Sequence, residues 1–196
     1  MGNISSPNYE YRNYSDEQLA LMSLSKNQNS YRELVLRYIK PISIFIQSYT
    51  RNEDETDDIV QDTFLKVWKN LHKFDSKNKF KPWLYKIARN TALDQSKKKK
   101  ILSFSSIVNN SNDIDSINNY ATEKNEIGDN IDNVELLKKV KNKIDQIHPE
   151  YRSVLILHYE EELTFEEISN IMNKPMNTVK SWHRRAINKL KNLFTN

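Results

Sequence analysis

Apolar residues recur at spacings of three and four along most of this chain, a period that is typical of amphipathic helices. The clearest run lies between residues 34 and 49, where Pro41 interrupts the pattern and predicts a kink. Its apolar positions are Leu34, Val35, Tyr38, Ile42, Phe45, Ile46 and Tyr49. Ser15 and Gln18 have the spacing of a capping box, so an earlier helix is expected to begin there.

Two more helices are predicted before residue 101. A cluster of acidic residues at Glu53–Asp58 precedes an apolar stripe that ends at Leu71, and acidic side chains favour the N-terminus of a helix. After a polar loop at about residues 72–79, Pro82 suits the first turn of the next helix. Four lysines at Lys97–Lys100 suit its C-terminal end, where cations are favoured.

The last third of the chain has the proportions of a helix-turn-helix. Helices are expected at about residues 134–147 and from Pro149 onward, and Thr164 and Glu167 form a second capping-box pair. The short helix that follows is broken at Asn173, a residue type that tolerates positive φ, and a longer basic helix begins near Met176. In that last helix, Val179, Trp182, Ala186 and Leu190 form the apolar stripe.

Composition narrows the fold class to all-α. The chain has 196 residues, no cysteine and only 2 glycines, which excludes disulfides, thiolate zinc sites and a glycine-rich phosphate loop. Such a low glycine content also disfavours β structure with many tight turns. No apolar run is long enough to span a membrane, and no signal peptide is evident, so we expect a cytoplasmic protein.

Charge divides the chain into two basic parts joined by an acidic connector. Residues 1–100 hold 18 basic and 12 acidic residues, residues 101–133 hold 1 and 6, and residues 134–196 hold 11 and 8. Two basic modules indicate two contacts with a polyanion, most simply nucleic acid. The alternative is that lysine-rich helices are merely well solvated.

Two candidate sites follow from these patterns. Aromatic and basic residues interleave from Trp68 to Arg89, as in proteins that grip single strands, although Trp68 and Trp83 also fit a helical core. Phe74 lies in a polar loop and is harder to assign to a core.

Asp54, Asp58 and Asp62 share a helix face and could hold a divalent metal for phosphodiester cleavage, but the helix dipole explains them more simply. We expect no catalytic residues, no metal and no cofactor.

Three strings, at residues 55–68, 80–94 and 151–189, resemble bacterial sigma factors of the sigma-70 family, specifically the extracytoplasmic-function (ECF) group that has only regions 2 and 4. The resemblance covers about residues 15–100 and 134–194. It implies two small helical modules joined by a flexible acidic linker. The expected organisation is a mobile tail at 1–14, a region 2 module at 15–100, a linker at 101–133 and a region 4 helix-turn-helix at 134–196.

The resemblance also implies a function and partners. Such a protein binds core RNA polymerase, through the β′ coiled coil and the β-flap, recognises the −10 and −35 elements of promoter DNA, and melts the duplex. An anti-sigma factor is a further partner that the family allows. The residues that match the polymerase-docking helix are Asp58, Gln61, Asp62, Leu65 and Trp68. Those that match the −10 contacts are Phe74, Lys77, Lys79, Trp83, Arg89, Asn90 and Lys97, and those that match the −35 contacts are Asn177, Thr178, Lys180, Ser181, Arg184 and Arg185.

This sequence departs from the family pattern in its recognition helix. Trp182 and His183 stand where an Arg–Leu pair is common, and we expect the Trp182 ring to cover the edge of the module core. The competing interpretation is a stand-alone helix-turn-helix regulator, which would have no use for a polymerase-docking helix.

Overall fold

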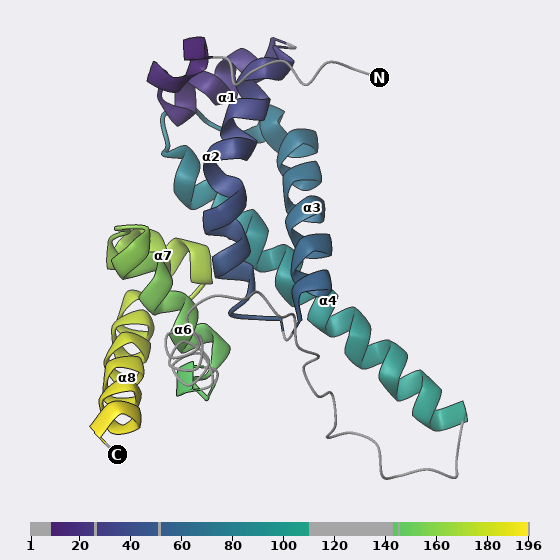
Figure 1. The fold of residues 1–196 in the computed structure, drawn as a ribbon, viewed down its shortest axis with the longest axis vertical. Helices are drawn as coiled ribbons and strands as arrows, with labels where there is room; N and C mark the ends of the chain where they lie inside the picture. Colours follow the sequence, from purple (N-terminus) through teal and green to yellow (C-terminus); the bar gives the residue numbers. More distant parts are fainter. Residues whose placement is uncertain (1–8, 26, 51, 110–142, 145, 196) are drawn as a thin grey trace, which may run out of the picture.

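The computed structural model of the protein describes residues 9–25, 27–50, 52–109, 143–144 and 146–195. Every regular element in these ranges is helical, which confirms the all-α prediction (Figure 1). We call residues 9–109 the N-terminal module and residues 143–195 the C-terminal module. No helix in the described ranges combines the length and the apolar character that a bilayer crossing requires.

The N-terminal module consists of four α-helices and two short 3₁₀ turns. Its elements are η1 (Tyr9–Asn13), α1 (Asp16–Leu24), α2 (Gln28–Ile46), α3 (Glu53–Asn70), η2 (Leu71–Lys73) and α4 (Phe80–Asn109). The expected capping box at Ser15 and Gln18 is present, and Asn27 caps α2 through its side chain. Helix α2 continues through Pro41 to Ile46.

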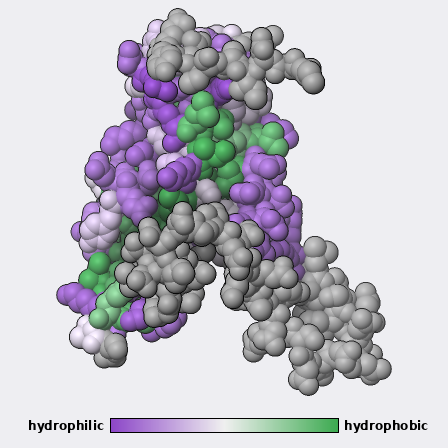
Figure 2. Space-filling view, viewed as in Figure 1, coloured by the Kyte–Doolittle hydropathy of each residue, from purple (hydrophilic) through white to green (hydrophobic). Residues whose placement is uncertain are grey.

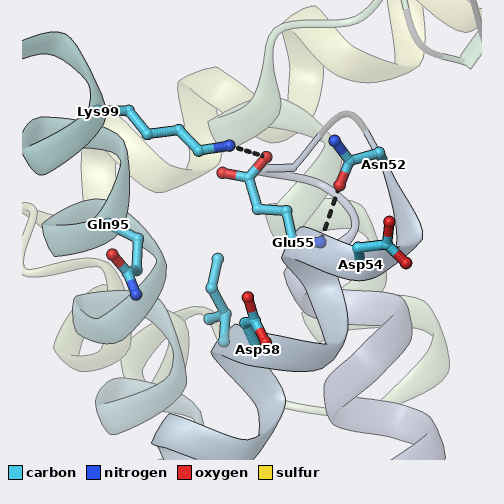
Figure 3. Close-up of a pocket in the computed structure, with 7 residues that line it drawn as sticks. Asn52, Asp54, Glu55, Asp58, Gln95 and Lys99 are labelled. Atoms are coloured by element: carbon cyan, nitrogen blue, oxygen red, sulfur yellow. Dashed lines mark hydrogen bonds and ion pairs between the residues drawn. The ribbon is translucent and has the colours of Figure 1, made fainter. Parts of the chain in front are cut away.

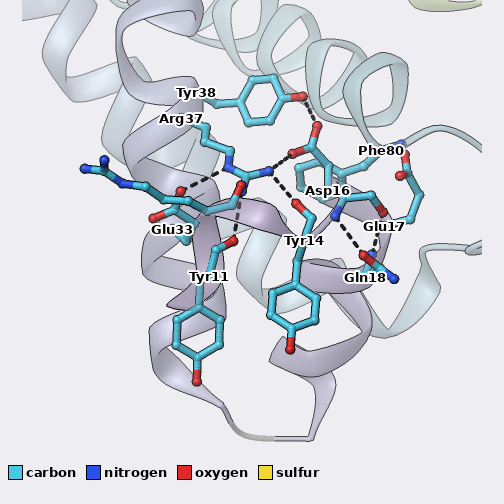
Figure 4. A network of polar contacts seen from close by, with 11 residues as sticks. Tyr11, Tyr14, Asp16, Glu17, Gln18, Glu33, Arg37, Tyr38 and Phe80 are labelled. Carbon is cyan, nitrogen blue, oxygen red and sulfur yellow. Dashed lines mark hydrogen bonds and ion pairs between the residues drawn. The ribbon is translucent and has the colours of Figure 1, made fainter. Parts of the chain in front are cut away.

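Two of the expected boundaries were wrong. Helix α4 extends to Asn109, so the first nine residues of the predicted linker are helical. The predicted tail at 1–14 is structured from Tyr9, because Arg37 of α2 donates hydrogen bonds to the carbonyls of Tyr11 (3.0 Å), Arg12 (3.0 Å) and Tyr14 (2.9 Å) (Figure 4). The same guanidinium pairs with Asp16 at 2.9 Å. The rest of the predicted linker, and most of the helix expected at 134–147, lie outside the described residues.

The C-terminal module contains the predicted helix-turn-helix. Its elements are α6 (Pro149–Leu155), a π-helical turn η3 (Ile156–Glu160), α7 (Phe165–Met172) and α8 (Met176–Thr195). The capping box at Thr164 and Glu167 starts α7, as expected. Asn173 ends α7 in the left-handed region, at φ 47° and ψ 49°, which is the conformation the turn was predicted to need.

A single hydrophobic core runs through both modules. It joins side chains of α2, α3 and α4 to side chains of α6, the π-helical turn, α7 and α8. Helix α7 packs against α4, and Figure 1 shows the C-terminal module lying beside the lower part of α2. The fully buried large side chains that anchor this core are Leu19, Leu34, Ile42, Phe45, Ile46, Ile59, Leu71, Phe80, Leu84, Tyr85 and Leu157.

Candidate nucleic-acid interface

Helix α8 separates its apolar stripe from its polar residues as the sequence predicts. Val179 and Ala186 are fully buried, and Trp182 is half-buried against the core with its ring centroid 6.0 Å from that of Tyr151. The expectation that Trp182 covers the core edge is therefore confirmed. The expected −35 residues lie elsewhere on the helix: Asn177, Lys180, Arg184 and Arg185 are exposed, and Thr178 and Ser181 are half-buried.

His183 belongs to an aromatic cluster that sequence reasoning missed. Its Nε2 lies 3.0 Å from the hydroxyl of Tyr159, and its ring centroid lies 5.3 Å from those of His158 and Phe165. Burial, together with the nearby His158, lowers the pKa of His183. The π-helical turn carries His158 and Tyr159, and nothing in the spacing of the sequence announces such a turn.

The start of α4 and the loop before it form a basic surface. Lys77 and Lys79 are exposed in the loop, and Asn90 and Lys97 are exposed further along α4. The loop itself is held in shape, since the Asp75 carboxylate accepts from the Lys77 amide at 3.0 Å and Glu17 accepts from the Phe80 amide at 2.9 Å. These contacts allow the lysines to project from a fixed backbone.

Two expected −10 residues are buried. Phe74 is only 7% exposed, and its ring packs on Phe80 and Trp83 with centroids 5.5 and 5.3 Å away, so the reasoning that kept it out of the core was wrong. Trp83 is half-buried in the same cluster. Arg89 is 6% exposed and pairs with Glu150 of the C-terminal module at 3.2 Å. In this arrangement neither the Phe74 ring nor the Arg89 guanidinium is presented to solvent.

Helix α3 presents an exposed face with apolar and polar residues. Leu65 is 55% exposed and Trp68 is 42% exposed, so the interpretation of Trp68 as mostly core was wrong. The Trp68 ring rests on Tyr31 of α2, with centroids 4.7 Å apart. Asp58 and Gln61 are exposed and Asp62 is half-buried. Figure 2 shows hydrophobic surface over the upper parts of α2 and α3.

The structure does not support a metal site at the three aspartates of α3, which are Asp54, Asp58 and Asp62. Asp54 and Asp58 line a shallow pocket between the start of α3 and α4, and Lys99 enters it to pair with Glu55 at 2.9 Å (Figure 3). Asn52 caps the helix by accepting from the Glu55 amide at 2.8 Å. Among the described residues, no group of three histidine or carboxylate side chains could hold a metal ion. The acidic residues thus serve the helix start.

Comparison with known proteins agrees with this division into two modules. Residues 30–101 match the family model for sigma-70 region 2, and residues 137–190 match the model for sigma-70 region 4. The ECF RNA polymerase sigma factor SigW of Bacillus subtilis is 30% identical over 79% of this chain and 83% of its own length.

Two solved structures have a similar fold. CnrH, in complex with the cytosolic domain of CnrY, gives a TM-score of 0.65 at 23% identity and covers 92% of this chain and 97% of its own. The sigma factor RpoE of Bartonella quintana, in complex with the anti-sigma factor NepR, gives a TM-score of 0.65 at 23% identity, over 84% of this chain and 96% of its own.

The chain belongs to the ECF group of the sigma-70 family of RNA polymerase sigma factors. It is accordingly a transcription initiation factor that recognises promoters.

Proposed function

We propose that the chain directs core RNA polymerase to promoters through three surfaces. Helix α3 docks on the β′ coiled coil, the surface around the start of α4 contacts the −10 element, and α8 reads the −35 element. It does so in the cytoplasm and without covalent chemistry of its own. The observation that carries the proposal is the arrangement of α8: Val179 and Ala186 are buried and Trp182 is half-buried, while the opposite side of the helix is exposed. The exposed residues are Asn177, Lys180, Arg184 and Arg185.

Helix α8 is suited to the major groove. A groove about 12 Å wide admits one helix, and arginine can bind the O6 and N7 atoms of guanine with two hydrogen bonds. Arg184 and Arg185 are the candidates for base contacts, whereas Lys180 is better suited to a phosphate, which gives affinity without sequence reading. Thr178 and Ser181, which are half-buried, would act at the edge of this surface.

At the −10 element, the exposed Lys77, Asn90 and Lys97 supply the phosphate and base contacts. Lys79, which pairs with Glu167 at 2.8 Å, joins them when that pairing is broken. Phe74 and Trp83 act by supporting the loop from beneath, because they pack together in the core. Arg89 joins this surface only when its pairing with Glu150 is broken. Melting is driven by binding, since holding a flipped base offsets the few kcal/mol that unstacking costs.

The α3 docking face can be tested by a double variant, Asp62→Lys with Leu65→Ala, in co-purification with core polymerase. Because Leu65 is 55% exposed, its truncation costs little folding stability while removing an apolar contact with the partner. The matched control is Glu160→Lys with Leu21→Ala, which changes an exposed acid and a 45% exposed leucine outside α3. We expect only the first variant to lose polymerase; equal recovery of both would place docking elsewhere.

An anti-sigma factor is a proposed regulator. The support is that the two solved structures described above contain a companion chain, CnrY in one and the anti-sigma factor NepR in the other. Its binding to this chain would be detected by competition with core polymerase for the α3 face.

A further inference from the structure

The first turn of α4 is capped by a side chain from a different helix. The amides of a helix's first turn have no partner within the helix, and the residue just before the helix usually supplies one. Here that residue is Lys79, whose side chain only donates hydrogen bonds. Glu17 of α1 takes its place, since its Oε1 accepts from the Phe80 amide at 2.9 Å (Figure 4). Helix α1 thus supplies a cap that the residue before α4 does not provide.

Glu17 suits this contact because it is ionised near neutral pH. Burial of the half-buried side chain raises its pKa, but the hydrogen bond from the Phe80 amide and the charge of Lys79 outweigh burial, so the pKa lies below its usual value. A carboxylate is favoured at the N-terminus of a helix, and charge-assisted hydrogen bonds are roughly twice as strong as neutral ones. The Phe80 amide is therefore held more firmly than a neutral cap would hold it.

The position of Glu17 is fixed by its neighbour Asp16. One oxygen of the Asp16 carboxylate pairs with Arg37 of α2 at 2.9 Å, and the other accepts a hydrogen bond from the buried Tyr38 hydroxyl. The Arg37 guanidinium is itself oriented by Glu33 at 3.1 Å, in addition to the carbonyls of the η1 segment described above. Helix α2 therefore holds the first turn of α1 in one orientation, and Glu17 lies in that turn.

The loop at residues 74–79 is held at both of its ends. At one end the Phe74 ring is buried and packs on Phe80 and Trp83. At the other end the Phe80 ring is 1% exposed, and its amide donates to Glu17. The exposed Lys77 projects from the backbone between these two ends. A change in where α4 begins would therefore move this side chain relative to the rest of the module.

We propose that Glu17 is a positioning residue for promoter recognition: by capping α4 from α1, it sets the place of the loop at residues 74–79 against the −10 element. The inference rests on the proposed function, which puts this loop at the −10 element. It gives a role to η1 and α1, whose residues precede the range 30–101 that matches sigma-70 region 2. Hydrogen bonds to bases and phosphates weaken steeply with distance and angle, so a displaced loop loses contacts without losing any side chain.

Transcription by core polymerase with the full chain tests the proposal, on a promoter that the unmodified chain directs. Two ratios of transcript yield are measured, in which the intact promoter is compared with one changed at a single −10 base pair or at a single −35 base pair. We expect Glu17→Ala to lower the −10 ratio ~5-fold or more, which is the value of one good base contact, and to leave the −35 ratio unchanged. Glu17→Gln should recover most of the loss, because its amide oxygen still accepts from the Phe80 amide.

The matched control is Asn52→Ala, which removes a helix cap elsewhere in the same module, where Asn52 accepts from the Glu55 amide at 2.8 Å. Each Ala variant loses one cap, so each should lower Tm by about 2–4 °C. Only Glu17→Ala should lower the −10 ratio. Equal effects of the two variants on that ratio, or an unchanged ratio in folded Glu17→Ala, would overturn the proposal, because Glu17 would then serve stability alone.

Hydrogen exchange in the free chain tests the cap without polymerase. The Phe80 amide should exchange ~10-fold or more faster in Glu17→Ala than in the unmodified protein, and at close to the original rate in Glu17→Gln. An original rate in Glu17→Ala would overturn the proposal. If Glu17→Ala does not fold, Glu17→Asp, whose shorter side chain draws the carboxylate away from the amide, replaces it in both measurements with the same expected direction.

These results also separate the positioning role from the proposed function. If the unmodified chain directs transcription with a −10 ratio that every Glu17 variant preserves, the positioning role is wrong and the proposed function stands. If the unmodified chain directs no transcription, or initiates without dependence on a −10 sequence, the proposed function falls and the positioning role falls with it.

Discussion

The single variants Trp182→Ala and Arg185→Ala should separate two properties of α8. The first is its contribution to folding stability, and the second is its discrimination between DNA sequences. Trp182 is half-buried against the core, with its ring near Tyr151. Removing a fully buried Trp costs about 3–5 kcal/mol, so about 2 kcal/mol is expected for a ring that is partly exposed. For a chain of this size each kcal/mol lowers Tm by about 2–4 °C, which predicts a loss of about 4–8 °C.

Arg185→Ala should behave in the opposite way. Its side chain is exposed and makes one hydrogen bond at 3.1 Å to the Tyr151 hydroxyl, so less than about 0.5 kcal/mol of folding stability is at stake. If Arg185 binds a guanine through two hydrogen bonds, its loss removes about 1–3 kcal/mol of discrimination against the wrong base. That corresponds to roughly 5- to 150-fold in relative affinity.

The assay combines thermal unfolding of the full chain, followed by circular dichroism, with competition between cognate and mutated −35 duplexes. Lys189→Ala is the control, because it removes another exposed cation of α8. Our reasoning is refuted if Trp182→Ala leaves Tm unchanged and abolishes −35 preference while Arg185→Ala lowers Tm. The two faces of α8 would then be assigned the wrong way round.

Three further predictions concern the same module. Asn173→Gly should leave stability nearly unchanged while Asn173→Ala costs about 1 kcal/mol in a denaturant titration, because only the latter strains the left-handed turn; equal losses would contradict this. Lys180→Ala should weaken binding to all duplexes alike and reduce the salt slope by about one ion; a selective loss for one sequence would instead make Lys180 a base contact. The folded state lowers the pKa of His183 below its usual 6.5, so it binds fewer protons than the unfolded state, and its contribution to stability is lost as pH falls through that value. The Tm of His183→Phe should therefore fall less than that of the unmodified protein between pH 7.5 and 5.5, and parallel declines would rule out this role.

Local signals predicted the helix-turn-helix well. The capping box at Thr164, the left-handed Asn173 and the stripe from Val179 to Ala186 depend on residues close together in sequence, so spacing and backbone preference suffice to find them. The same is true of the acidic start of α3. These features define the helix-turn-helix without reference to any long-range contact.

Aromatic burial was predicted less well because it depends on distant partners. Phe74 has no periodic context, yet the hydrogen bond from the Phe80 amide to Glu17 holds its loop against α1. Trp68 lies on the periodic stripe of α3, but the helix surface there faces solvent and the ring finds only Tyr31. Spacing within one helix does not reveal where neighbouring helices stop.

The contact between the modules was not predicted from the sequence either, because it also depends on residues that are far apart along the chain. Ser48 and Ser153 are separated by 105 residues, and neither belongs to a motif. The net charges of the two modules are both positive, which favours separation. The modules nevertheless share one hydrophobic core, and Glu150, Glu161 and Glu167 pair with cations of the N-terminal module. Such ion pairs form only when the fold brings distant residues together, so local sequence patterns do not predict them.

The most direct test of the central assignment is transcription in vitro. Core RNA polymerase is given genomic DNA fragments with and without the full chain, and transcript 5′ ends are sequenced. The account predicts new transcripts only when the chain is present, each preceded by shared −35 and −10 motifs, with the −35 preference lost in Arg184→Ala or Arg185→Ala. Transcripts that are identical with and without the correctly folded chain would contradict it.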